Sequence, residues 1–344
     1  MNPTFISKER SQALKGCALF MMVFLHLFNQ TAHLQTTFSL CEIDGVPLVN
    51  FMARGMGPVG FYLFLSGYGL YSVYKSKKLT GGGGNSARLA KLMIIYWLSL
   101  IVFVTIGNFI KPDVYPGNIL DLVQNITAYH TTYNGEAWFL FPYILTSLTC
   151  GFLFKILDRF KGLIVYIVCV FMYLGSCFLI SRYYVSFFDS HYAIYHVVLY
   201  LSFLLPFMSG AIFCKYADKE YSGAYIRCLN SIPQWTLVVV LLMLYVSRCI
   251  VSSAAYSPFY VCLFVVLFLR IRWWNRIERS MMFLGKFSTS VWLIHTWFCY
   301  YLFRDFIYGF HYPILILIVE FAVSIMSGYV IQKIAAMVYR MLRL

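Results

Sequence analysis

The sequence predicts an all-α integral membrane protein, a bundle of about ten transmembrane helices with both termini in the cytoplasm. Of its 344 residues, 61% are hydrophobic and only 12% are charged, and the mean hydropathy is +0.73. These values are typical of multi-pass membrane proteins and exclude a water-soluble domain of this size. We expect a single transmembrane domain over residues 1–344, with no separate soluble domain.

Ten apolar segments each come close to the roughly 20 residues that a helix needs to cross a bilayer. They lie at 12–31, 56–75, 89–109, 137–155, 162–180, 192–214, 233–251, 255–270, 281–303 and 312–338. The segment at 255–270 is the weakest, because it is short and contains Pro258. A tilted or partly re-entrant helix is the alternative there.

The basic residues set the orientation of this bundle. With ten spans, 22 of the 27 Lys and Arg residues fall in the termini and loops of one side. The other side holds only Arg54, Lys111, Arg182, Arg248 and Arg304. Because Lys and Arg gather on cytoplasmic loops, both termini are expected in the cytoplasm. The net charge of +14 is therefore explained by the membrane topology. We expect the protein to associate with the lipid bilayer and not with nucleic acid.

The cysteines and the glycine-rich stretch carry weaker signals. The ten cysteines form no C-x-x-C pair and no metal-like spacing, so we interpret them as small core residues and expect neither disulfides nor a metal site. The run Gly81–Gly84 predicts a flexible cytoplasmic linker. A phosphate-binding loop is the less favoured alternative, because no Lys-Ser or Lys-Thr follows the glycines.

The first apolar segment carries the most informative pair of residues, Lys15 and His26. At about 100° per residue, the step between them is roughly three helical turns, so both side chains project from nearly the same face. The rise is about 16 Å, roughly half the bilayer core. An ionisable residue at that depth indicates a functional site. The alternative for His26 is a structural histidine that bonds to a hydroxyl of a neighbouring helix, and the alternative for Lys15 is a lysine that only sets the topology.

Further candidates lie on the second and fourth segments. Ser66 follows a small-residue stretch and is expected to offer a hydroxyl near the depth of His26, while helix packing explains the adjacent glycines. Glu136 and Trp138 begin the fourth segment at the outer surface. A solvated loop acid and an interfacial tryptophan are the alternatives for these two.

The ninth segment repeats the pattern of a cation followed by a histidine. Lys286 and His295 are nine residues apart, or about 14 Å along a helix. Two histidines at similar depth in the membrane favour a shared cavity. The remaining five histidines, His33, His130, His191, His196 and His311, lie in or near outer loops, where exposure accounts for them.

Four ordered stretches make the chain resemble a known family, the membrane-bound acyltransferase family 3, which includes bacterial O-acetyltransferases of surface glycans. These stretches are the basic residue with a histidine eleven positions on, FLSGYGL at 64–70, AWFL at 137–140 and LGKFSTSVWLIH at 284–295. No single motif is specific, but their order is. Two positions depart from the family: Tyr68 replaces a phenylalanine, and Gln12 stands where many relatives carry an aspartate.

The resemblance implies an enzyme of the bacterial cytoplasmic membrane that moves an acyl group, first of all acetyl, from acyl-CoA to a hydroxyl of a surface or lipid-linked sugar. It implies His26 as the general base and Lys15 as its basic partner. Acyl-CoA is the expected co-substrate, with no metal. The expected substrate-binding residues are Ser66, Tyr68, Glu136, Trp138, Lys286 and His295, and the basic loop at 75–91 is expected to assist with the donor phosphates.

Two functions from other classes stay open. An exporter of polysaccharide or lipid-linked oligosaccharide would use the polar line of the first helix as a path, although the chain lacks the broken helix pairs of many transporters. A membrane glycan polymerase is the third interpretation. Such an enzyme would be expected to carry a larger outer loop, rich in arginine, than any in this sequence.

Overall fold

The computed structural model describes residues 6–43, 45–76, 84–217 and 232–344. In this part of the chain, the strands form one antiparallel hairpin, β1 (Glu42–Ile43) and β2 (Val46–Pro47). The helices are α1 (Lys8–Phe28), α2 (Leu48–Arg54), α3 (Pro58–Lys75), α4 (Gly84–Ile110), α5 (Ile119–Ile126), α6 (Leu140–Arg159), α7 (Gly162–Tyr183), α8 (Tyr192–Ala217), α10 (Gln234–Ile250), α11 (Ser257–Arg270), α12 (Asn275–Lys286), α13 (Ser288–Thr296), α14 (Arg304–Tyr308) and α15 (Pro313–Met341). Short 3-10 turns lie at η1 (Thr31–His33), η2 (Gly135–Phe139) and η4 (Ala254–Tyr256), and π turns at η3 (Tyr184–Phe188) and η5 (Trp297–Tyr301).

Seven of the described helical segments are long and apolar enough to cross a membrane. They are Lys8–Phe28, Leu48–Lys75, Gly84–Ile110, Gly135–Arg159, Gly162–Phe188, Tyr192–Tyr216 and Pro313–Met341. Two shorter apolar helices, Gln234–Ile250 and Ala254–Arg270, match the predicted segments at 233–251 and 255–270. The chain is therefore an all-α, multi-pass membrane protein. The number of ten spans and the cytoplasmic location of the termini stay predictions.

The predicted continuous helix at 281–303 is wrong. Helix α12 ends at Lys286, Phe287 leaves the helical conformation with φ −99° and ψ 2°, and α13 begins at Ser288. The physical reason lies in α12, which carries the exposed Arg276 and Arg279 and therefore belongs at a surface. Lys286 and His295 consequently lie on two different helices.

Pro258 has a different role from the one expected of it. It occupies the first turn of α11, after the short turn η4. Proline is favoured at this position because the first helical N–H groups have no partner within the helix. The residue therefore begins the helix and does not interrupt it. The predicted linker at Gly81–Gly84 lies outside the described residues except for Gly84, where α4 begins.

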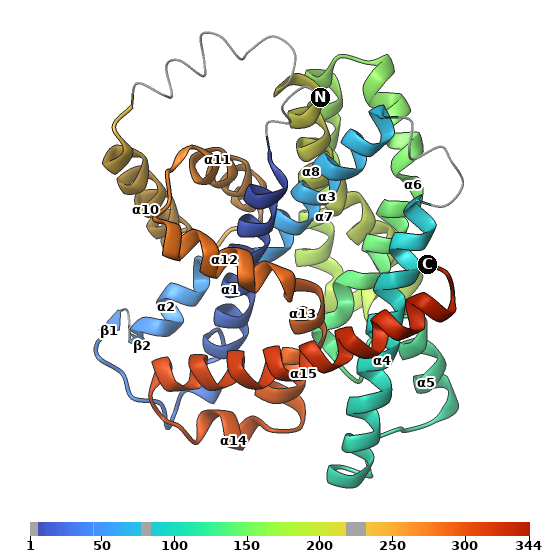
Figure 1. Cartoon of the computed structure of the whole chain (residues 1–344), viewed down its shortest axis with the longest axis vertical. Helices are drawn as coiled ribbons and strands as arrows, with labels where there is room; N and C mark the ends of the chain where they lie inside the picture. Colours follow the sequence, from blue (N-terminus) through green and yellow to red (C-terminus); the bar gives the residue numbers. More distant parts are fainter. Residues whose placement is uncertain (1–5, 44, 77–83, 218–231) are drawn as a thin grey trace.

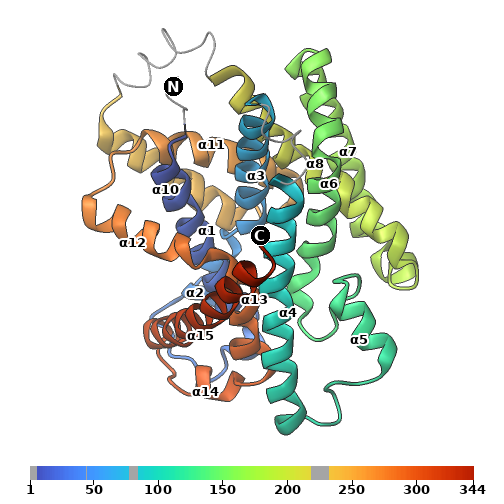
Figure 2. The ribbon, with the colours of Figure 1, turned by 45° about the vertical axis from the view of Figure 1, so that its right-hand side comes forward.

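The helices are arranged around α1. Figures 1 and 2 show α10, α11 and α12 on one side of α1, and α3 with α6, α7 and α8 on the other. The long helix α15 lies obliquely across α13 and α4 (Figure 1). Because α1 contacts α3, α12 and α13, its side chains meet residues from distant parts of the sequence.

Helices α3 and α8 pack with their backbones in close contact. A Cβ atom on Gly67 would overlap the carbonyl group of Phe207, and one on Gly210 would overlap that of Phe64. Small residues at such crossings allow membrane helices to approach closely. Gly67, in the stretch at 64–70, is therefore a packing residue, and its neighbour Ser66 is held in place by this contact.

Gly67→Ala is therefore expected to lower the thermal unfolding temperature of the protein in detergent, because overpacking costs about 1–3 kcal/mol. Gly69→Ala is the matched control on the same helix, since a Cβ there meets no atom within 4 Å. Equal unfolding temperatures for the two variants would contradict the packing role of Gly67.

A second close contact fixes the N-terminal half of α1 against α12. Gly16 meets the backbone of Met281, and Gly285 meets that of Gln12. An ion pair between Arg10 Nε and Glu278 Oε1, at 3.3 Å, joins the same two helices. These contacts hold the turn of α1 that carries Lys15.

Candidate functional site

One cavity of about 740 Å³ contains most of the predicted site residues. Five of the eight line it: Lys15, His26, Ser66, Glu136 and Trp138. Its wall comes from α1, α3, α4, η2, α6 and α13, with Ser257 of α11 added at one end. Pockets of this size are typical of sites for small molecules and cofactors.

The cavity follows the length of α3. Its lining includes Gly57, Pro58, Tyr62, Ser66, Gly69 and Val73, which recur every three or four residues and therefore form one face of the helix. From Gly57 to Val73 the rise is about 24 Å. The space is therefore elongated, with one end at each end of α3.

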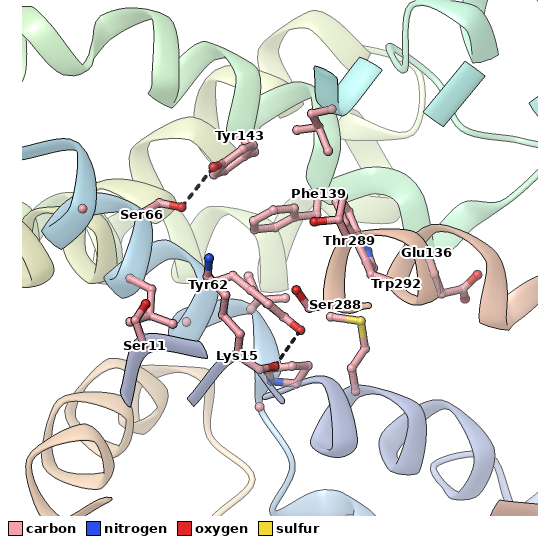
Figure 3. Close-up of a pocket in the computed structure, with 18 of the residues that line it drawn as sticks. Ser11, Lys15, Tyr62, Ser66, Glu136, Phe139, Tyr143, Ser288, Thr289 and Trp292 are labelled. Carbon is pink, nitrogen blue, oxygen red and sulfur yellow. Dashed lines mark hydrogen bonds between the residues drawn. The ribbon is translucent and has the colours of Figure 1, made fainter. Parts of the chain in front are cut away.

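Three cations line the end of the cavity that holds Ser66 and Tyr143. They are Lys15 of α1 and Arg88 and Lys91 of α4. Figure 3 shows the side chain of Lys15 pointing into the same space as Ser66 and Tyr143. The two ion pairs of the described residues, Arg10–Glu278 and Lys75–Asp158, include none of these three cations. This end therefore carries positive charge without a paired carboxylate.

Arg88 is held in place by neutral groups. Its Nη1 donates to the Tyr143 hydroxyl at 2.5 Å, and its Nη2 donates to Ser147 Oγ at 2.9 Å and to Asn85 Oδ1 at 3.1 Å. Asn85 in turn donates to the carbonyl oxygen of Ser147. A guanidinium fixed by neutral partners keeps its full charge, which favours an anionic ligand nearby.

Ser66 lies at the same end as Lys15. Its Oγ is 3.0 Å from the hydroxyl of Tyr143, the partner of Arg88, and Tyr62, one turn away, donates to the Lys15 carbonyl oxygen at 3.4 Å. The two contacts are visible in Figure 3. The expectation that Ser66 lies near the depth of His26 is therefore wrong: α1 and α3 cross with Ser66 beside the Lys15 turn.

His26 and His295 are in direct contact. His26 Nδ1 lies 2.7 Å from His295 Nε2, and the two rings are tilted by only 18°. His26 lines the cavity, while His295 is fully buried behind it. The sequence favours a cavity shared by the two histidines, whereas in the structure they are in contact and only His26 lines the cavity.

The His26–His295 pair is supported from both helices. Asn134 donates to the Leu293 carbonyl oxygen at 3.2 Å and accepts from the Thr296 hydroxyl at 2.9 Å, which ties η2 to α13 on both sides of His295. On α1, the Tyr300 hydroxyl lies 2.5 Å from the carbonyl oxygen of His26. The backbones that carry both rings are therefore fixed.

Glu136 lies across the cavity from Ser66 and Lys15 (Figure 3), and Trp138 lines the cavity from the same turn, η2. Glu136 Oε2 accepts a hydrogen bond of 2.6 Å from the Tyr301 hydroxyl, which itself accepts from the backbone N–H of Gly135. The second carboxylate oxygen accepts no hydrogen bond from the described residues, and Trp138 is 38% exposed. A carboxylate and an aromatic ring together suit a neutral, hydroxyl-rich ligand.

Three predicted site residues lie outside the cavity lining. The hydroxyl of Tyr68 accepts from the backbone N–H of Ile6, and its ring packs on Phe213. Lys286 is exposed at the end of α12. His295 reaches the cavity only through His26.

The outer-loop histidines are less uniform than expected. His196 is only 4% exposed, and its Nε2 lies 2.6 Å from the Tyr129 carbonyl oxygen, so exposure does not account for it. Burial, with the nearby charge of Arg304, lowers the pKa of His33. Neither histidine lines the cavity.

Sequence reasoning missed Tyr143 and Trp292, and it included Arg88 only as part of a basic loop. Of that loop, Arg88 and Lys91 line the cavity, and their position at the start of the apolar segment 89–109 is the signal that could have identified them. Tyr143 and Trp292 line the cavity from α6 and α13. No local pattern distinguishes them from the many other aromatic residues of the chain.

Comparison with known proteins supplies the family. A family model described as an acyltransferase domain, that of the acyltransferase 3 family, matches residues 10–332. No curated protein and no solved structure matches the chain. The matched region contains every helix that lines the cavity, from Lys15 in α1 to Trp292 in α13. The chain therefore belongs to the acyltransferase 3 family.

Proposed function

We propose that this acyltransferase moves an acyl group, acetyl in the first instance, from acyl-CoA to a hydroxyl of a surface or lipid-linked sugar, in a bacterial cytoplasmic membrane. The observation that carries the proposal is the elongated cavity that joins three cations, His26 and a carboxylate with an aromatic ring. An anionic donor and a neutral, hydroxylated acceptor thus each meet a complementary end.

The cationic end is the proposed donor site. Lys15, Arg88 and Lys91 would contact the phosphates of the CoA head group, since charge-assisted hydrogen bonds to phosphate are the strongest that such side chains make. The rest of the lining is largely apolar and includes Met22, Leu25 and Phe139. This stretch suits the pantetheine arm, which would deliver the thioester towards His26.

His26 is the proposed general base. It would take the proton of the acceptor hydroxyl while the hydroxyl oxygen attacks the thioester carbon, and the proton would pass to the sulfur as the carbon–sulfur bond breaks. The products are the acylated sugar and free CoA thiol, with no net proton released. General base catalysis of this kind contributes about 10²–10⁴ to the rate.

The end near Glu136 and Trp138 is the proposed acceptor site. The free carboxylate oxygen of Glu136 would accept from sugar hydroxyls, and the exposed ring of Trp138 would stack on a sugar face. Tyr301, which donates to the other carboxylate oxygen, fixes this side chain.

Arg88→Met is expected to weaken the binding of acetyl-CoA to the purified protein by about 10–100-fold, because a hydrogen bond to a charged group is worth about 1.5–3 kcal/mol. Lys286→Met is the matched control, because this cation is exposed and outside the cavity lining. Isothermal titration calorimetry in detergent measures both constants. If the Lys286 variant loses saturable binding of acetyl-CoA and the Arg88 variant keeps it, the assigned donor site is contradicted. If the wild-type protein shows no saturable binding of acetyl-CoA, an exporter is favoured.

A further inference from the structure

The hydrogen bonds of His295 determine which of its ring nitrogens carries the hydrogen. Its Nδ1 lies 2.9 Å from the carbonyl oxygen of Val291 and 2.9 Å from that of Trp292. Carbonyl oxygens only accept hydrogen bonds, so Nδ1 is the donor. In the neutral ring, Nε2 therefore carries the lone pair.

The same reasoning extends to His26. The lone pair on His295 Nε2 faces His26 Nδ1 at 2.7 Å, so Nδ1 of His26 must donate. Neutral His26 then carries its own lone pair on Nε2. The opposite direction would set the lone pair of His295 Nδ1 against two carbonyl oxygens. The alternative is a cationic His295, which is 0% exposed and contacts no carboxylate of the described residues.

We propose that His295 is a positioning residue that fixes the Nδ1–H tautomer of His26 and so selects Nε2 as the nitrogen that takes the acceptor proton. This inference rests on the proposed function for its role in the reaction. The tautomer itself follows from the contacts alone.

The pair acts during transfer as well as before it. When His26 Nε2 takes the proton from the acceptor hydroxyl, the ring becomes cationic, and its Nδ1–H···Nε2 hydrogen bond to His295 becomes charge-assisted. In serine hydrolases a carboxylate holds the histidine in this way. In this protein the neutral imidazole of His295 has that position. When the proton passes from Nε2 of His26 to the departing sulfur, His26 is neutral again with its hydrogen on Nδ1.

Nitrogen NMR tests the tautomer directly. The wild-type protein would be labelled with ¹⁵N-histidine and placed in lipid bilayers, and the His26 signals would be assigned by their loss in His26→Asn. A pyrrole-type Nδ1 and a pyridine-type Nε2 on His26 are expected at neutral pH. The reverse pattern on His26 would overturn the inference whatever the activity of the protein.

Two substitutions of His295 test its role in catalysis. His295→Gln places a carbonyl oxygen close to the former Nε2 and keeps an acceptor for His26 Nδ1, so kcat should fall by no more than about tenfold. His295→Leu removes the acceptor, and kcat should fall by about 10²–10⁴, as when a histidine loses the group that sets its tautomer. The Kd for acetyl-CoA should stay within about threefold in both, since His295 is outside the cavity lining.

The outcomes separate this inference from the proposed function. Equal losses of kcat in the Gln and Leu variants, with donor binding intact, would overturn the positioning role. A wild-type protein that shows the expected tautomer but binds no acyl-CoA and acylates no sugar would overturn the proposed function and leave the tautomer assignment standing.

Discussion

His26→Asn is expected to reduce kcat/KM for acyl transfer by about 10²–10⁴, because it removes the general base. Asparagine is the most informative replacement, because its amide nitrogen lies near the position of Nδ1 and can still donate to His295 Nε2. A hydrogen bond then still joins the two helices, in place of the one of 2.7 Å between the histidines. The lone pair on Nε2 of His26, which would take the proton, is lost. The loss of rate therefore reports chemistry and not a change of packing.

The measurement is acyl transfer from radiolabelled acetyl-CoA to glycan in membranes, at matched protein levels. Acetyl-CoA binding should persist in the variant, because the proposed phosphate ligands are Lys15, Arg88 and Lys91 and not His26. His191→Asn serves as the control, since that exposed histidine stacks on Phe187 outside the cavity. Unchanged glycan acylation by His26→Asn would exclude His26 as the base.

The parts of the site that follow from one helix could be predicted from the sequence. The periodicity of an α-helix is fixed, so the eleven-residue step placed Lys15 and His26 on one face, and both line the cavity. The sequence also favoured a cavity shared by His26 and His295, but it did not predict their direct contact, in which His295 lies outside the lining.

The parts that depend on how helices cross could not be predicted. The depth of Ser66 relative to His26 depends on where α3 and α1 meet, and this is fixed by contacts such as Tyr62 with Lys15. The partnership of Arg88 with Tyr143 joins residues 55 positions apart. Neither has a local signature, because both result from tertiary packing.

The break at Phe287 shows where hydropathy misleads. The segment at 281–303 is mostly apolar, and Lys286 and His295 are its only basic residues, so composition favours one helix. The structure divides it because Gly285 packs against the backbone of Gln12 in α1, which directs α12 along the surface. This contact is possible because Gly285 has no side chain, and a hydropathy average carries no information about such close backbone contacts.

Gly69→Leu is expected to abolish acyl transfer by closing the donor end of the cavity. Gly69 lines the cavity one turn from Ser66, on the side of Val73, and a Cβ there meets no atom within 4 Å. A leucine side chain can therefore enter the space without displacing the protein around it. It would fill the cavity next to Ser66 and the cations, so acetyl-CoA binding should weaken by at least about 100-fold, the equivalent of roughly 2.8 kcal/mol.

Two matched variants make this experiment specific. Gly57→Leu places the side chain at the start of α3, where a Cβ meets only Ser257 Oγ at 3.8 Å, and it should impair acceptor use while acetyl-CoA still binds. Gly175→Leu adds the same side chain at an exposed position of α7 outside the cavity and should leave both activities unchanged. Because the three variants differ only in where one leucine is placed, loss of donor binding in Gly69→Leu alone assigns the direction of the cavity, with acyl-CoA entering from the end of α3 near Val73. Full donor binding by Gly69→Leu would mean that acyl-CoA reaches His26 by another route.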